Sequence, residues 1–204
     1  MTGVSTLKAS FCLLWLCAVG AGIAIVLNYQ NVQGASGATP NRWPSGTHIA
    51  LDASHDTLLM FAHPKCPCTR ASMEELNRVL ARCRGQVTTH VLFFKPSQFS
   101  ADWSQTDLRS SAAAIPEVMV QDDPDGKLAE KFGAETSGYV VLYDRQGRLL
   151  FHGGITGGRG HAGDNGGEAT VIALIGEENP QKEQAPVYGC SLLNQSCSRE
   201  VAAK

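Results

Sequence analysis

The chain has 204 residues, of which 43% are hydrophobic and 18% charged, and its formal net charge is −2. These values indicate one globular domain of ordinary size with appendages, and they exclude a disordered chain. Because the chain carries no basic run interleaved with aromatic residues, nucleic acid is not an expected partner.

The N-terminal region is a predicted membrane span. No charged residue occurs from Ala9 to Leu27, and a helix of about nineteen residues is roughly 28 Å long, close to the hydrocarbon thickness of a bilayer. A secretory signal has a shorter apolar core of about 7–15 residues, although Ala35-Ser36-Gly37 offers a cleavage site for one. We therefore expect an uncleaved anchor at residues 9–27.

The distribution of positive charge predicts the orientation of this span. Lys8 precedes it, and the first positive residue after it is Arg42. The positive-inside tendency then places residues 1–8 in the cytoplasm and the remainder of the chain outside it, in the periplasm if the cell is Gram-negative.

Composition divides the remainder into three parts. Residues 28–45 are rich in Gly, Ser, Asn and Gln, a composition that buries little and predicts a linker. A folded domain is expected over residues 46–180, followed by a cysteine-containing tail at 181–204.

Strand and helix signals alternate along this domain. A weak strand is expected at His48–Ala53 and a strong, buried strand at Thr57–Ala62. The helix after Cys68 repeats apolar residues at three- and four-residue spacing as far as Cys83, and Gly85 is a plausible stop. The further expected elements are the strand Val87–Phe94, the helix Ser104–Ala114, the strand Glu117–Gln121, the helix Lys127–Phe132, the strands Tyr139–Tyr143 and Arg148–Phe151 joined by a hairpin turn, and the helix Glu168–Ile175. This order predicts an α/β sandwich with a mixed sheet.

Cys66-Pro67-Cys68 stands where the buried strand gives way to this helix. A helix N-terminus carries about half a positive charge, so it stabilises a thiolate and lowers the pKa of a cysteine. Proline suits the first turn of a helix, where its missing N–H costs nothing. Lys65 and Arg70 would favour the anion further.

The residues around this motif resemble those of the thioredoxin superfamily. LLMFAHPKCPCTRASMEEL, residues 58–76, is similar to its strand, active-site turn and first helix, and FGAETSGYVVLYDRQGRLLFHGG, residues 132–154, is similar to its second half. The resemblance covers roughly residues 46–176 and is closest to membrane-tethered, extracytoplasmic thioredoxin-like proteins of bacteria, including the RedB group. It implies a three-layer sandwich with a mixed central sheet, behind one transmembrane helix.

The chain departs from the family pattern in two places. Cys66 lies one position later than the family's first cysteine, where Lys65 stands instead, and Gly138 falls where the family usually has a cis-proline that holds a substrate strand. A Cys-x-Cys disulfide closes a smaller ring than Cys-x-x-Cys, so strain should make it easier to reduce. This spacing favours an oxidant or isomerase over a strong reductant.

The expected role of the site is thiol–disulfide exchange with protein thiols or disulfides, without a cofactor. Cys66 is the predicted nucleophile, nearer the exposed tip of the turn, and Cys68 the resolving thiol. His63 is either a proton carrier or a structural residue of the turn. A redox-inactive adaptor that only binds partners remains a further alternative.

A Gly-rich loop follows the last strand. Gly158, Gly160 and Gly163 satisfy G-x-G-x-x-G, but too little chain remains for the following strand and acidic residue that a dinucleotide site needs. Arg159 and His161 could approach the Cys-Pro-Cys turn from this flexible loop.

Two thiols and a distant histidine also describe a site for a soft metal. Cys66, Cys68 and His161 would suit Cu(I) or Zn. The Sco-type copper chaperones, which are likewise anchored thioredoxin-like proteins, pair two cysteines with a later histidine. Their cysteine spacing is wider, and their histidine precedes the last hairpin. A copper metallochaperone is therefore the alternative function.

The remaining cysteines after the predicted span have structural or redox interpretations. Cys190 and Cys197 most simply pair in a second disulfide in an oxidising compartment, or they pass electrons to Cys66 and Cys68 as a second redox pair. Cys83 lies on the apolar face of its helix and is expected in the core.

Overall fold

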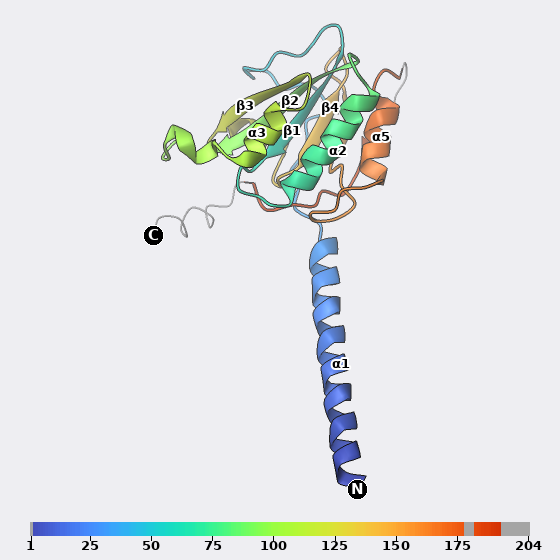
Figure 1. The fold of residues 1–204 in the computed structure, drawn as a ribbon. Helices are drawn as coiled ribbons and strands as arrows, with labels where there is room; N and C mark the ends of the chain where they lie inside the picture. The colour runs from blue at the N-terminus through green and yellow to red at the C-terminus, as the bar shows by residue number, and fades with distance from the viewer. Residues whose placement is uncertain (1, 178–181, 193–204) are drawn as a thin grey trace. The chain divides into compact units, whose positions relative to one another are not determined.

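The computed structural model describes residues 2–177 and 182–192. The chain divides into two compact units, Met1–Val32 and Gln33–Lys204. Figure 1 shows the first as a long helix and the second as a sheet covered by helices. The two units are described separately.

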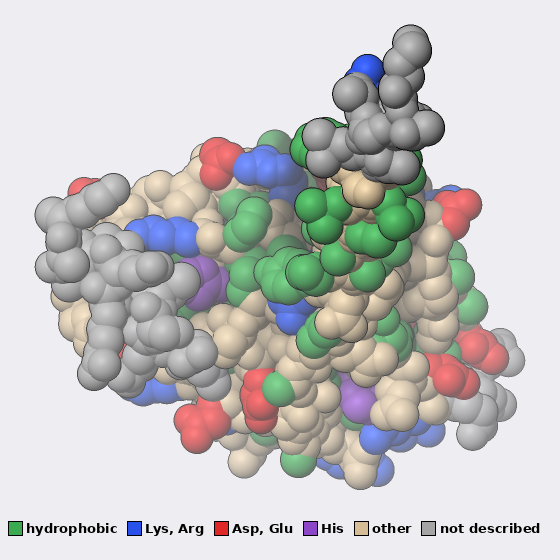
Figure 2. Space-filling model, turned by 90° about the horizontal axis from the view of Figure 1, so that it is seen from below, with side chains coloured by type: hydrophobic (Ala, Val, Ile, Leu, Met, Phe, Trp, Pro, Cys, Tyr) green, Lys and Arg blue, Asp and Glu red, His purple; other side chains and the backbone are tan. Residues whose placement is uncertain are grey.

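Helix α1 runs from Thr2 to Asn31. Its stretch Lys8–Asn31 has 24 residues and is the one helix in the described part of the chain that is long and apolar enough to cross a membrane. Exposed hydrophobic side chains gather on α1 in Figure 2, whereas charged side chains of both signs are dispersed over the visible face of the domain. By length and composition, α1 is a possible single-pass anchor or a signal sequence.

The second unit is built on a six-stranded mixed sheet with the order β3-β2-β1-β4-β5-β6. Strand β1 pairs in parallel with β2 and antiparallel with β4, and β2 pairs in parallel with β3. Strands β4 and β5 form the antiparallel hairpin. The bounds are β1 Asp56–Ala62, β2 Val87–Lys95, β3 Val118–Pro124, β4 Tyr139–Tyr143, β5 Leu149–Gly153 and β6 Glu183–Gln184.

Helices cover both faces of the sheet and complete three layers. Helices α2 (Thr69–Arg82), α3 (Asp107–Ala113) and α5 (Gly166–Leu174) lie on one face, which Figure 1 presents to the viewer. Helix α4 (Lys127–Phe132) covers the other face. Successive residues of β1 serve the two cores alternately, so that Leu58 and Met60 pack under α2 while Leu59 and Phe61 pack against the α4 side. The architecture is the predicted thioredoxin-like α/β sandwich.

Three local expectations differ from the structure. Residues 48–53 are not a strand, because the Asp52 carboxylate accepts the backbone N–H groups of Ser54 and His55 and forms a turn. The helix expected from Ser104 divides into a 3₁₀ turn, Ala101–Ser104, and α3, because Thr106 caps the start of α3. Strand β6 lies in the tail, where no strand was expected.

Part of the segment expected as a linker packs on the domain. The Pro40 carbonyl accepts a hydrogen bond from the Tyr143 hydroxyl over 2.7 Å, and the Ala35 carbonyl accepts one from Thr136 over 2.7 Å. The Trp43 ring meets Tyr143 edge-on, with 5.3 Å between ring centroids. These residues therefore extend the layer that covers the α4 face of the sheet.

Candidate functional site

The Cys-Pro-Cys turn joins β1 to α2. The Cys66 N–H donates to the His63 carbonyl over 3.1 Å, and the Thr69 N–H donates to the Cys66 carbonyl over 3.2 Å. Cys68 is the residue that caps the N-terminus of α2, and its side chain bonds to no backbone N–H there. Backbone hydrogen bonds thus hold both cysteines at a helix N-terminus, where partial positive charge favours a thiolate.

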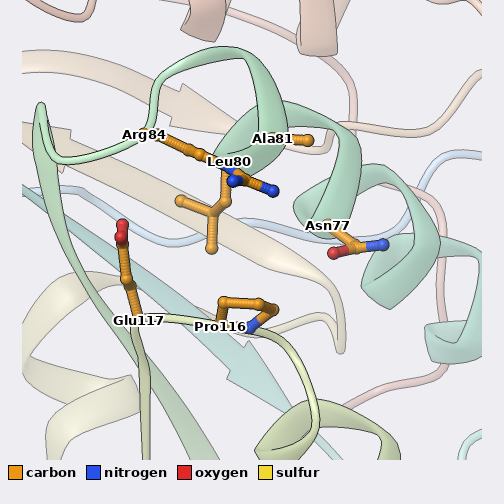
Figure 3. A pocket seen from close by; sticks show the side chains of 6 residues that line it. All are labelled: Asn77, Leu80, Ala81, Arg84, Pro116 and Glu117. Atoms are coloured by element: carbon orange, nitrogen blue, oxygen red, sulfur yellow. The ribbon is translucent and has the colours of Figure 1, made fainter.

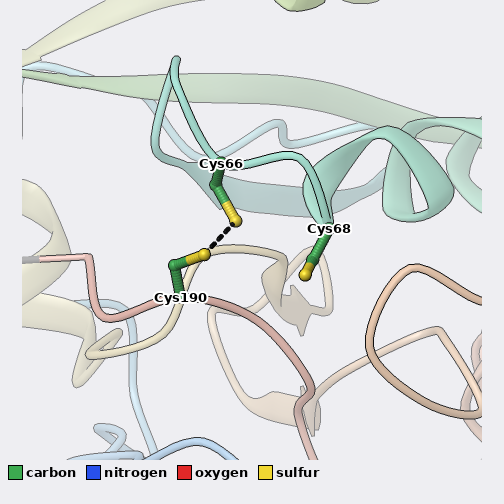
Figure 4. A group of neighbouring side chains, drawn as sticks. All are labelled: Cys66, Cys68 and Cys190. Atoms are coloured by element: carbon green, nitrogen blue, oxygen red, sulfur yellow. Dashed lines mark hydrogen bonds between the residues drawn. The ribbon is translucent and has the colours of Figure 1, made fainter. Parts of the chain in front are cut away.

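Three cysteine sulfurs meet at this turn, as Figure 4 shows. The Sγ atoms of Cys66 and Cys190 are 2.9 Å apart, and those of Cys66, Cys68 and Cys190 all lie within 4.8 Å of one another. Cys66 is only 3% exposed, whereas Cys68 and Cys190 are half-buried. The expectation that Cys66 lies nearer the exposed tip is therefore wrong, because its side chain points inward, toward Cys190.

Cys190 reaches the turn on residues 187–192, which we call the tail strap. The strap runs antiparallel to the loop before β4, with Ser191 opposite Thr136. The Ser137 N–H donates to the Cys190 carbonyl over 2.9 Å, and the Leu192 N–H donates to the Glu135 carbonyl over 2.7 Å. The strap thus places Cys190 beside a residue 124 positions earlier in the chain. The predicted partner of Cys190, Cys197, lies outside the described residues.

The surroundings of the three thiols separate their pKa values. The hydrogen bond with Cys190, followed by bonds from Thr69, lowers the pKa of Cys66 to about 4, against the effect of burial. With Cys66 ionised, the Cys190 thiol is the donor, and holding this proton raises the pKa of Cys190. Burial and the neighbouring Cys66 thiolate raise the pKa of Cys68, while the charge of Arg159 opposes both effects. Cys66 is therefore the thiolate of the group.

A chain of hydroxyl groups supports the Cys66 thiolate. The Thr69 and Ser137 hydroxyls are 2.6 Å apart, and Ser137 Oγ accepts the His63 N–H over 2.7 Å. Since the Thr69 hydroxyl also bonds to Cys66, the consistent direction is Ser137 donating to Thr69 and Thr69 donating to the thiolate. No sequence pattern indicated Thr69 or Ser137, because their roles depend on contact between the start of α2 and the loop before β4.

His63 and Lys65 lie against an aromatic group on the other side of the turn. His63 is buried, its Nδ1 accepts the Lys65 N–H over 3.2 Å, and burial lowers its pKa. Its ring stacks on Phe94 and meets Trp103 edge-on. The Lys65 ammonium lies over the Trp103 ring, 4.7 Å from its centroid. Of the two roles considered for His63, these contacts favour the structural one.

Gly138 stands directly before β4 with φ +92°, and the described residues contain no cis peptide bond. Its N–H donates to the Phe61 carbonyl over 2.8 Å. A Cβ atom at Gly138 would lie 2.7 Å from Ser72 Oγ. The position thus keeps the loop close to α2, while the tail strap pairs with the residues just before it.

Gly138→Ala is expected to destabilise the domain by about 1–3 kcal/mol, because it adds both backbone strain and a steric conflict with Ser72. Urea unfolding of the full chain in detergent measures the loss. Gly85→Ala is the matched control, since Gly85 also has positive φ, +67°, but its added Cβ would meet nothing within 4 Å. A loss at Gly138 no larger than that at Gly85 would show that Ser72 contributes nothing.

The Gly-rich loop brings one of its two predicted residues to the site. Arg159 Nη1 donates to the Gly189 carbonyl of the tail strap, and its charge lowers the pKa of Cys68 and Cys190. His161 is exposed, bonds to the Arg159 carbonyl through Nδ1, and is not part of the three-sulfur group. The loop therefore contributes a cation near the thiols but no imidazole.

A buried carboxylate ties this loop to α2. Glu75 Oε1 accepts the Gly163 N–H over 2.6 Å and lies 3.3 Å from Arg78, while Oε2 has no hydrogen-bond partner. Burial raises the pKa of Glu75. Between its unfolded and folded pKa values the folded chain therefore binds the extra proton, so stability falls as pH rises through this interval.

Glu75→Gln is therefore expected to lessen the loss of stability as the pH rises from 4.5, the ordinary pKa of a glutamate, because glutamine keeps the acceptor for Gly163 without a buried charge. Each kcal/mol gained corresponds to a rise in Tm of about 2–4 °C for a chain of this size. Thermal unfolding across this pH range measures the effect, and Glu74→Gln, at an exposed neighbouring position, is the control. Parallel pH profiles for the wild type and Glu75→Gln would contradict the prediction.

The other described cysteines are not part of this three-sulfur group. Cys83 is buried in the core under α2, as predicted, and burial raises its pKa. Cys12 and Cys17 are exposed on α1. A pocket lies at the C-terminal end of α2, away from Cys66 and Cys68 at its N-terminal end. Figure 3 shows the side chains that line it, none of which is a cysteine: Asn77, Leu80, Ala81, Arg84, Pro116 and Glu117.

Comparison with known proteins identifies the fold. No family model and no curated protein matches the chain. An uncharacterized conserved protein from Geobacillus kaustophilus is 16% identical with a TM-score of 0.59, over 82% of this chain and 95% of that chain. A hypothetical protein from Sinorhizobium meliloti 1021 is 19% identical with a TM-score of 0.58, over 81% and 96%. A putative thiol:disulfide interchange protein from Chlorobium tepidum is 18% identical with a TM-score of 0.45, over 71% and 99%. The likeness to the first two shows a shared fold, which confirms the predicted fold class.

Proposed function

We propose that the protein is a thiol–disulfide oxidoreductase that reacts through Cys66 with protein thiols or disulfides. The observation that carries this proposal is the Cys66 sulfur at the N-terminus of α2, with its pKa lowered to about 4 and two further thiols within 4.8 Å. A thiolate of this kind attacks a disulfide sulfur to give a mixed disulfide, and a neighbouring thiol then releases the product. A thioredoxin-like fold is consistent with this chemistry.

We further propose that α1 anchors this domain outside the cytoplasm, in the manner of the RedB-like proteins, with residues 1–8 inside. The support for an anchor is the apolar stretch Lys8–Asn31, and the support for the orientation is the position of Lys8 at its N-terminal end. Resistance of the full chain to alkaline extraction from membranes tests the anchor. The side of the membrane on which the domain lies is tested with Glu74→Cys, a substitution at an exposed position. An impermeant maleimide should label this cysteine in intact cells, or in spheroplasts where an outer membrane is present.

Trapping of mixed disulfides tests the proposed chemistry. In the full chain with Cys68→Ser and Cys190→Ser, Cys66 has no neighbouring described thiol to release a bound partner. Such a chain should accumulate covalent complexes with proteins, which a reductant dissolves. The matched control adds Cys66→Ser. Complexes that persist in this control, or their absence from the trapping variant, would overturn the proposal.

Three clustered sulfurs also support the soft-metal alternative. Thiolates are preferred ligands of Cu(I) and Zn, and here Cys190 takes the place that the sequence suggested for His161. Stoichiometric binding of Cu(I) or Zn by the full chain, lost in Cys68→Ser, would favour this alternative. If the chain neither exchanges disulfides nor binds metal, the remaining alternative is a redox-inactive adaptor that only binds partner proteins.

A further inference from the structure

We propose that Cys190 is the thiol that resolves reactions at Cys66, so that the oxidised product is a Cys66–Cys190 disulfide that ties the tail strap to the site. This inference rests on the proposed function and assigns its second catalytic residue. Cys190 contacts the reacting atom itself, because its sulfur lies 2.9 Å from the Cys66 sulfur.

The separation of the sulfurs favours Cys190 over Cys68. At 2.9 Å the Cys66 and Cys190 sulfurs are inside their van der Waals contact distance, and a disulfide bond of about 2.05 Å requires only a small approach. Two sulfurs that share a metal ion at about 2.3 Å from each would stand farther apart than this. A disulfide between Cys66 and Cys68 would instead close the small, strained ring of a Cys-x-Cys pair.

The backbone of the tail strap holds Cys190 in this position. Two backbone hydrogen bonds fix the strap around Ser191, directly after the cysteine, from the Ser137 N–H to the Cys190 carbonyl and from the Leu192 N–H to the Glu135 carbonyl. Arg159 bonds to the Gly189 carbonyl on the other side of Cys190. The hydrogen bond to Cys66 and burial raise the pKa of Cys190, and the charge of Arg159 opposes both effects. A thiol held this close acts at a high effective concentration, because folding has already brought the two sulfurs together and no further translational or rotational entropy is lost in the reaction.

The proposed reaction balances as two successive exchanges. The Cys66 thiolate attacks one sulfur of a substrate disulfide, forms a mixed disulfide and releases the first substrate sulfur as a thiolate. The Cys190 thiol gives up its proton to the released substrate thiolate and attacks Cys66 Sγ, the mixed disulfide breaks, and the second substrate sulfur leaves as a thiolate that takes a proton from water. The substrate disulfide is reduced to two thiols, and Cys66 with Cys190 is oxidised to a disulfide.

The tail strap also occupies the edge of the loop before β4. It pairs antiparallel with Glu135–Ser137 through the two hydrogen bonds and the Thr136–Ser191 bridge, as an added strand does on an open edge. Oxidation of Cys66 and Cys190 to a disulfide would therefore attach the tail strap covalently over the buried Cys66 sulfur. Reduction of the Cys66–Cys190 bond would leave the strap held by its hydrogen bonds and its buried side chains alone, as in the structure described.

Peptide mapping of the purified full chain in detergent tests this assignment. The reduced chain is reacted with one equivalent of 5,5′-dithiobis(2-nitrobenzoate), quenched in acid and digested with trypsin, which separates residues 66–70 from residues 183–199. The expected product is these two peptides joined by a disulfide. Separate peptides, with the disulfide inside residues 66–70 or inside residues 183–199, would overturn the proposal in favour of Cys66–Cys68 or Cys190–Cys197.

Two double variants identify which cysteine sulfurs form the disulfide between the two peptides. With Cys68→Ser and Cys197→Ser, Cys66–Cys190 is the one bond that can join these peptides, and the linkage should persist. With Cys66→Ser and Cys197→Ser, a Cys68–Cys190 bond should form at least about tenfold more slowly, because Cys68 lacks the activated thiolate.

Release of the coloured thiolate separates failure of the inference from failure of the proposed function. In Cys190→Ser the first thiolate should still be released as an adduct forms on Cys66, whereas the second should be released at least about tenfold more slowly than in the wild type. A second release that depends on Cys68 and not on Cys190 would overturn the inference and leave the proposed function standing. Absence of an adduct on Cys66 would overturn both.

Discussion

Cys66→Ser is expected to lower the rate of disulfide exchange by roughly 10³-fold or more, because it removes the thiolate that the other groups at the turn stabilise. Reduction of a model disulfide by the reduced full chain in detergent measures this rate. Serine keeps the size and hydrogen-bonding capacity of the side chain, and thermal unfolding of the variant verifies that the fold is retained. The loss would then report chemistry rather than structure.

Cys68→Ser provides the matched comparison for this result. Cys68 lies on the same turn and is more exposed than Cys66, but burial and the neighbouring thiolate raise its pKa. Its replacement should therefore reduce exchange far less than that of Cys66. A larger loss with Cys68→Ser than with Cys66→Ser would assign the nucleophile to Cys68 and contradict the role proposed for Cys66.

The burial of Cys66 implies a condition on its reactivity. The sulfur is inside the domain and beside the tail strap, so a protein disulfide reaches it only when the strap moves aside. Two backbone hydrogen bonds hold the strap to the loop before β4, and each contributes only about 0.5–1.5 kcal/mol net. Val187 and Leu192 of the strap are also buried in the core on the α4 side. A partner that replaces these contacts is therefore expected to displace the strap.

The parts of the fold that were predicted are those whose signals are local. Strands β1 and β4 are fully buried and appear in the sequence as short apolar runs, and α2 shows helical periodicity along its buried face. Residues 33–45 and strand β6 carry no such pattern. Their order comes from contacts with β4 and β5, such as the Tyr143 hydroxyl on the Pro40 carbonyl, which no periodicity reveals.

In the candidate site, too, the residues with a local sequence signal were predicted and those placed by long-range contacts were not. Cys66 and Cys68 were recognisable because their turn follows a buried strand and begins a helix. Cys190 was predicted to pair with Cys197 or to pass electrons to Cys66 and Cys68 together with it. Spacing alone does not place its sulfur beside a turn 124 positions earlier. Arg159 and His161 looked equivalent in the sequence, yet only Arg159 contacts the strap, because the Gly158–His161 bridge folds the loop between them.

The pKa of Cys66 offers the sharpest test of how the three thiols act together. In the reduced wild-type chain, Cys66 should be half ionised at about pH 4 and should react with iodoacetamide at a constant rate above about pH 6. The hydrogen bond with Cys190 is the largest cause of this low value. Cys190→Ala removes the donor and should raise the midpoint of the Cys66 pH profile by more than one unit.

Each unit by which the pKa exceeds the working pH lowers the thiolate fraction about tenfold, so at pH 5 the alkylation of Cys66 in Cys190→Ala should fall sharply. Cys190→Ser is the matched control, because its hydroxyl can still donate to the Cys66 sulfur, and its midpoint should stay nearer the wild-type value. Alanine also loosens the tail strap and makes Cys66 more accessible, which raises the plateau rate but leaves the midpoint as a measure of ionisation. Equal midpoints in the wild type and Cys190→Ala would show that Thr69 and the N-terminus of α2 stabilise the thiolate without Cys190.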